Sequence, residues 1–187
     1  MQLSLTVLDI SETELAKAPA FYSKVQADIT SPSFVPDGAH DLAFSRMLAE
    51  HVGDAETFHR NVRSLLKPGG VAIHLFPTLH TFPFAVNRLV PESVSTALVR
   101  LFHPGRDLYQ HAKFPARYEW CRGPTRSEIR HLTSAGFEVD EFVAAFGHNY
   151  YTNIPLLRDV HAAKTAFLLK HPRPMLTSFA MVTLRKS

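Results

Sequence analysis

The chain has 187 residues, 45% of them hydrophobic, so it can bury one substantial core, and we expect a single domain over residues 1–187. Its 20 basic and 17 acidic residues are scattered, which argues against a nucleic-acid partner. One cysteine, Cys121, excludes an intramolecular disulfide and fits a cytoplasmic location. No apolar run approaches the roughly 20 residues of a membrane span.

The first half of the chain alternates β-prone segments with helical ones. Strands are expected at residues 3–8, 24–27, 41–45 and 71–76. A short helix should follow Ser11, because Glu14 completes a capping box with it. A second helix over 54–66 carries an apolar stripe and should end at Pro68-Gly69-Gly70, since glycine can adopt the left-handed cap. This alternation predicts an α/β fold with a parallel sheet covered on both faces.

The second half departs from that rhythm. Residues 78–124 are rich in Phe, Pro, His and Arg and include a helix-like stretch at 92–102, so we interpret them as an insertion that caps the site. Thr125, with Glu128, should cap a helix that ends at residue 135. The remaining elements are expected to be a strand at 137–145, a helix at 155–169 and a strand at 175–184.

Two early strands end at acidic residues. Asp9 closes the first strand, Asp28 follows the second, and the third ends at Ser45. Ligands of open α/β sheets bind at the carboxyl ends of the strands, so this layout indicates a nucleotide cofactor. A nicotinamide-dependent dehydrogenase is disfavoured because the chain contains no Gly-x-Gly-x-x-Gly.

Five motifs in this order resemble class I S-adenosylmethionine (SAM)-dependent methyltransferases of the small-molecule, type 11-like kind. They are residues 8–11, 27–29, 36–45, 48–52 and 65–70. The resemblance is close over roughly residues 3–76 and looser from residue 125 onward. It implies a Rossmann-like sheet with helices on both faces, SAM as cofactor, and a small-molecule methyl acceptor as partner.

The resemblance also assigns roles to single positions. Asp9 matches the acid that holds the ribose hydroxyls, and a carboxylate can accept both hydrogen bonds. Asp28 matches the acid near the adenine amino group, with Ile29 packing on the ring. Residues 45–47 lie beside the methionine part and the methyl acceptor. The implied cofactor-binding residues are Asp9, Ile10, Asp28, Ile29, Ser45 and Arg46. The structural alternatives are that Asp9 is a helix N-terminal acid and Asp28 a turn residue.

One expected part is absent from the sequence. The family's first strand and glycine-rich loop precede the position of Asp9, yet only eight residues do so here, and no Gly-x-Gly occurs. That strand lies mid-sheet in the family, so its loss would leave two open sheet edges. The sequence therefore predicts an N-terminally truncated methyltransferase, weakly active or inactive as written. The alternatives are a gap filled by another chain or a re-paired sheet, and a non-catalytic methyltransferase-like partner subunit.

The aromatic and basic residues of the capping insertion are candidates for acceptor binding. The substrate-side candidates are His111, Tyr118 and Tyr150, with His111 or Tyr118 as a general base. The alternative is that Tyr118 and Trp120 only pack the cap onto the sheet. Methyl transfer requires alignment of donor and acceptor more than a catalytic base, so no catalytic residue is assigned.

The eleven histidines do not indicate a metal site. Glu56-x-x-His59 and Glu128-x-x-His131 are each expected on a solvated helix face, without a further ligand. The neighbouring pair Glu50-His51 is expected to support the fold rather than to catalyse, and Cys121 to be a buried small residue. Self-association into a homo-oligomer stays open.

Overall fold

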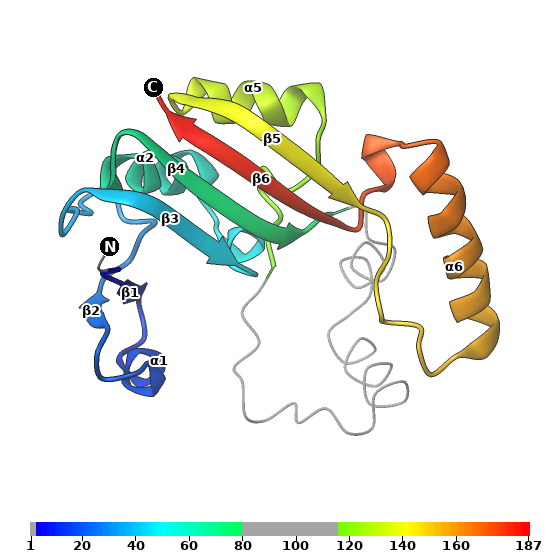
Figure 1. The fold of residues 1–187 in the computed structure, drawn as a ribbon, viewed down its shortest axis with the longest axis horizontal. Helices are drawn as coiled ribbons and strands as arrows, with labels where there is room; N and C mark the ends of the chain where they lie inside the picture. Colours follow the sequence, from blue (N-terminus) through cyan, green and yellow to red (C-terminus); the bar gives the residue numbers. More distant parts are fainter. Residues whose placement is uncertain (1–2, 80–115) are drawn as a thin grey trace.

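The computed structural model describes residues 3–79 and 116–187 (Figure 1). Its strands are β1 (Thr6–Asp9), β2 (Ser23–Gln26), β3 (His40–Arg46), β4 (Leu66–Pro77), β5 (Phe137–Ala145) and β6 (Phe179–Lys186). Its helices are α1 (Glu12–Lys17), α2 (Ala55–Leu65), α5 (Arg126–Ser134) and α6 (Pro155–Lys170), with short 3₁₀ turns η1 (Ala49–His51) and η2 (Pro174–Leu176). The predicted elements are confirmed in this part of the chain, although the last strand begins at Phe179 rather than at residue 175. The capping insertion lies mostly outside the described residues.

Side-chain caps set the starts of three helices. Ser11 Oγ accepts the Glu14 N–H at 3.3 Å, and Thr125 Oγ1 accepts the Glu128 N–H at 3.3 Å. Both capping contacts confirm the serine and threonine starts read from the sequence. Asp54 caps α2 in the same way through the N–H of Thr57.

The strands form two separate sheets among the described residues. β1 and β2 pair in parallel, and the second sheet has the order β3-β4-β6-β5. β3 is parallel to β4, whereas β6 is antiparallel to both β4 and β5. Within the described chain, β1 and β3 each pair on one side only, and Figure 1 shows them as the facing members of the two sheets. This is the point at which the resemblance places the family's first strand.

The end of α2 differs from the prediction. The helix ends at Leu65, and Leu66 is already extended and begins β4, so Gly69 is not the helix cap. Its φ of +75° instead belongs to an irregular turn at the start of β4, between the pairs His40–Leu66 and Leu42–Val71. Glycine is still required nearby, because a Cβ at Gly70 would lie 2.9 Å from the carbonyl oxygen of Lys67.

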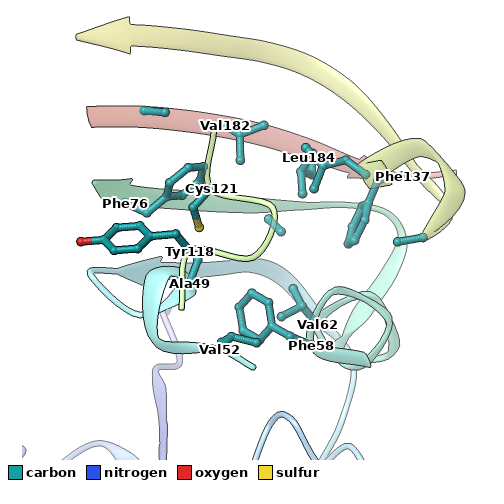
Figure 2. Close-up of a cluster of buried hydrophobic side chains, with 14 of the residues drawn as sticks. Ala49, Val52, Phe58, Val62, Phe76, Tyr118, Cys121, Phe137, Val182 and Leu184 are labelled. Atoms are coloured by element: carbon teal, nitrogen blue, oxygen red, sulfur yellow. The ribbon is translucent and has the colours of Figure 1, made fainter. Parts of the chain in front are cut away.

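The core lies between one face of the larger sheet and helices α2 and α5. Phe58 and Val62 of α2 pack under Val182 and Leu184 of β6, as Figure 2 shows. On the opposite face, Phe44 of β3 is 72% exposed. The hydrophobic core of the described residues therefore packs on the face of the larger sheet that α2 and α5 cover.

Two predictions about helix faces were wrong. His59 and Glu128 were expected in solvent, yet they are 4% and 1% exposed. His59 stacks on Trp120, and Trp120 stacks in turn on His131. These histidines face the segment after residue 116, which comes from a distant part of the chain. The spacing of residues within a helix cannot predict a contact with such a distant segment.

Candidate functional site

The acidic residues at the ends of β1 and β2 lie at one edge of the smaller sheet. Asp9 is opposite Gln26 in the parallel register, so Asp28 follows two residues beyond that pair. The carbonyl oxygen of Asp9 accepts the N–H of Ala27 at 3.1 Å, which extends the pairing beyond the strand. Parallel pairing thus brings the two acids to the same carboxyl edge.

The Asp9 carboxylate is only partly engaged. Its Oδ1 accepts the N–H of Ser11 at 2.8 Å, just before α1. Among the described residues, Oδ2 has no hydrogen-bond partner, and the neighbouring Ile10 side chain is 60% exposed. Asp9 therefore shapes the local turn through one oxygen and has a second oxygen left for a further contact.

Asp28 is arranged in the same way. Its Oδ1 accepts the backbone N–H of Thr30 at 2.8 Å and the Thr30 hydroxyl at 2.7 Å, which forms a local turn. Oδ2 again has no partner within the described chain. The carbonyl of Ile29 accepts a hydrogen bond from Asn61 of α2 at 2.8 Å, and Ile29 packs against the core.

The end of β3 holds a hydrogen-bonded pair and a left-handed residue. Ser45 Oγ lies 2.7 Å from Nδ1 of His74, its register partner on β4. Arg46 is exposed. Met47 has a φ of +57°, while its N–H donates to the carbonyl of Leu75 at 2.8 Å. Left-handed non-glycine residues are often found at functional sites, and the sequence alone gave no sign of this one.

Glu50 anchors the segment that follows residue 116. Its carbonyl oxygen accepts the N–H groups of Arg117 at 2.7 Å and of Tyr118 at 3.0 Å. Tyr118 and Trp120 also have positive φ values, 55° and 50°. The Glu50 side chain is buried, and burial raises the pKa of its carboxyl. These contacts fit the supporting role expected of the Glu50-His51 pair.

Tyr118 belongs to the core through its ring. In Figure 2 the ring lies beside Phe76, and its hydroxyl points away from the cluster. Burial raises the pKa of Tyr118, and the nearby Glu50 and Tyr150 raise it further. The raised pKa keeps the Tyr118 phenol protonated near neutral pH, so its hydroxyl is not available as a general base. His111 lies outside the described residues.

Sequence reasoning missed a buried histidine cluster behind Ser45. The His59 and His74 rings are 5.4 Å apart, and Trp120 stacks on His59. Burial lowers the pKa of His59 to about 4 and that of His74 to about 3, so both rings are neutral near pH 7. His59 Nδ1 donates to the carbonyl of Ala55 at 2.7 Å. The available signal was the two-residue period of the strand, which places His74 on the same face of β4 as Ala72 and Phe76.

Other reactive groups do not form a second centre in the described part. There, no three His, Cys, Asp or Glu side chains lie together in a way that could hold a metal ion. Cys121 is 1% exposed, which confirms the prediction of a buried small residue, and burial raises the pKa of its thiol.

Of the helices in residues 3–79 and 116–187, none is long and apolar enough to cross a membrane.

The chain is similar to known methyltransferases in part of its sequence. Residues 2–74 match the model of a family described as a methyltransferase domain. No curated protein matches the sequence. The matched residues contain Asp9, Asp28 and Ser45.

The fold is shared with solved methyltransferase structures. A SAM-dependent methyltransferase from Methanosarcina mazei superimposes with a TM-score of 0.55 at 17% identity, covering 98% of this chain and 82% of that one. An N-methyltransferase from Bradyrhizobium japonicum, solved with S-adenosyl-L-homocysteine, gives 0.51 at 14% identity, with 98% and 66% covered. A [4+2]-cyclase, SpnF, gives 0.54 at 16% identity, with 98% and 66% covered.

These comparisons confirm the resemblance to SAM-dependent methyltransferases and the Rossmann-like α/β fold. The chain spans 66% of the length of both the cyclase and the Bradyrhizobium enzyme. Identities below one fifth establish a common fold, and activity has to be argued from the site.

Proposed function

We propose that this protein is a SAM-dependent methyltransferase of a small molecule, with its nucleoside site at the carboxyl ends of β1 and β2. The observation that supports the proposal is a pair of carboxylates, each with only one oxygen hydrogen-bonded within the described residues. Asp9 and Asp28 each use Oδ1 for a local turn and leave Oδ2 without a partner among the described residues. The adenosine half of SAM carries ribose hydroxyls and an adenine amino group, which are donors for such oxygens.

The residues present fit the two halves of SAM unequally. Asp9 and Ile10 are assigned to the ribose side, and Asp28 and Ile29 to the adenine side. Ser45 and Arg46 are assigned to the methionine side, at the end of β3. The sequence contains no Gly-x-Gly, and β1 and β3 lie in different sheets within the described chain. We therefore propose that this chain alone holds the nucleoside half better than the methionine half and binds SAM weakly.

Bound SAM would supply an electrophilic methyl group, so the chain's own residues need only align the acceptor and exclude water. Tyr118 and Tyr150 are assigned to the acceptor side: Tyr118 belongs to the segment that docks on Glu50, and Tyr150 interacts electrostatically with Tyr118. With a raised pKa, Tyr118 serves as a hydrogen-bond donor in this scheme and not as a base. We propose a cytoplasmic enzyme, in line with its single buried cysteine.

Saturation-transfer NMR with S-adenosyl-L-homocysteine tests the nucleoside site. Protein saturation should reach the adenine and ribose protons more strongly than the homocysteine protons. Asp9→Asn and Asp28→Asn should each weaken the signal, whereas Glu12→Gln, an exposed acid nearby on α1, should leave it unchanged. Equal or stronger saturation of the homocysteine protons would contradict the assignment.

The separated sheets favour a second candidate, a non-catalytic partner subunit that retains the scaffold. In that case the protein should co-purify with a complete methyltransferase, and methyl transfer should require both chains. Activity of the complete enzyme alone, at the rate of the mixture, would remove this candidate.

A further inference from the structure

Helix α6 carries an apolar stripe on the side away from the rest of the described chain. Its packed side contains His161 and Thr165, which contact the segment after β5, and Leu168, which is buried. His148 donates its N–H to His161 Nε2 at 3.1 Å, and Thr165 Oγ1 donates to the carbonyl of Phe146 at 3.3 Å. Figure 1 shows α6 standing at the side of the molecule, beyond the ends of β5 and β6.

The stripe is regular and exposed. Its members are Leu156, Val160, Ala163 and Phe167, spaced by four, three and four residues. Leu156, Val160 and Phe167 are 76%, 60% and 59% exposed. Alternating steps of four and three residues are the a/d pattern of a coiled-coil seam. In a globular protein such an apolar stripe normally packs on the protein's own core. Because this stripe is exposed, it is suited to pack against another helix.

We propose that α6 is a self-association surface, on which the α6 of a second copy of this chain packs in parallel along the Leu156–Phe167 stripe. In the heptad pattern Leu156 takes position d and Val160 position a. Leucine at d with a β-branched residue at a favours two parallel strands.

Charge complementarity selects the parallel arrangement. Asp159 precedes Lys164 by five residues, and both are exposed. With Leu156 at d, they occupy positions g and e, which meet across a parallel pair. Each Asp159, whose Oδ1 also accepts from Nε of Arg158 on its own helix at 2.9 Å, then faces Lys164 of the second copy, giving two ion pairs between the copies. An antiparallel pair would instead place Asp159 near Ala166 and Lys164 near Leu157, without an opposite charge.

The contact is small, so the dimer should be weak. A helix of 16 residues is about 24 Å long, and one such pair buries less than the roughly 1,600 Å² of a standard interface. We expect monomer and dimer to exchange, which makes covalent trapping the suitable readout. The single native cysteine is buried and will not interfere.

Oxidative cross-linking of a full-length Leu156→Cys variant tests the proposal. In a parallel pair the two introduced thiols face each other, so a disulfide dimer should form. In an antiparallel pair centred on the stripe they would be about 16 Å apart, because 11 residues separate positions 156 and 167. Leu169→Cys is the matched control, since it is 68% exposed but lies off the stripe. It should cross-link only at the rate of random collision.

Charge reversal provides the second test. In the Leu156→Cys background, Asp159→Lys and Lys164→Asp should each slow cross-linking about fivefold, and the double reversal should restore the rate. Val160→Glu should abolish it while the circular dichroism spectrum stays unchanged. Equal cross-linking at positions 156 and 169, or a double reversal as slow as the singles, would overturn the proposal.

Discussion

The hydroxyl oxygen of Ser45 lies 2.7 Å from Nδ1 of His74, and this contact joins the end of β3 to the buried histidine cluster. The other ring nitrogen of His74, Nε2, has no hydrogen-bond partner in the described part of the chain. We infer that Nδ1 carries the proton and donates to Ser45, because an unpaired buried lone pair costs less than an unpaired buried N–H. A ligand group that approaches Ser45 would therefore meet its hydroxyl as a free donor.

Replacement of Ser45 should destabilise the protein measurably. Ser45→Ala leaves Nδ1 of His74 without a partner in a fully buried site, which should lower the free energy of unfolding by about 1 to 3 kcal/mol. Urea denaturation followed by circular dichroism measures this. Ser33→Ala, an exposed serine, serves as the control. Equal midpoints for wild type and Ser45→Ala would contradict the contact.

The buried histidines predict a loss of stability in acid. The folded-state pKa of His59 is lowered to about 4 and that of His74 to about 3, both below the unfolded value near 6.5. The unfolded chain thus binds more protons, so their stabilisation is complete above pH 6.5 and falls as the pH drops towards 4. His59→Gln should flatten this dependence in thermal unfolding, whereas exposed His171→Gln should not. Identical acid profiles for all three proteins would rule the cause out.

Glu128 predicts the opposite trend. Burial raises its folded-state pKa to about 7, although Arg122 lowers it in part. Stability from the protonated form is complete below the unfolded value near 4.5 and is lost as the pH rises through 7. Glu128→Gln keeps the shape and the backbone cap, so its melting temperature should vary less between pH 5 and pH 8. Exposed Glu138→Gln should follow the wild type. A steeper dependence in Glu128→Gln would contradict the assignment.

The capping residues in the sequence predicted where the helices begin. The features that the sequence did not predict depend on contacts between distant parts of the chain. Ser11 and Thr125 predict the starts of α1 and α5, because the hydroxyl oxygen of each accepts the backbone N–H of the residue three positions later. His59 is buried against Trp120, which lies 61 positions later in the chain, so the spacing of residues within α2 could not predict its burial. The positive φ of Met47 is likewise imposed by pairing with Leu75. The turn at Gly69 was placed correctly, but α2 ended before it.

The candidate site was predictable in outline only. Parallel pairing brings Asp9 and Asp28 to one edge, as strand ends followed by acids indicate. In the structure, Oδ1 of Asp9 accepts the N–H of Ser11 and Oδ1 of Asp28 accepts the N–H of Thr30, each within a local turn. The carbonyl of Glu50 holds a segment more than 60 positions later in the chain, and no local sequence pattern reveals that contact.

The most direct test of the account is a calorimetric titration of S-adenosyl-L-homocysteine into the 187-residue chain, shown to be folded by circular dichroism. We predict weak, saturable binding, with a Kd of about 10⁻⁴ M, which corresponds to a binding free energy of about −5.5 kcal/mol. The Asp9→Asn variant should lose this binding. No heat beyond dilution from folded wild-type protein, or binding that Asp9→Asn leaves intact, would contradict the nucleoside site at the ends of β1 and β2.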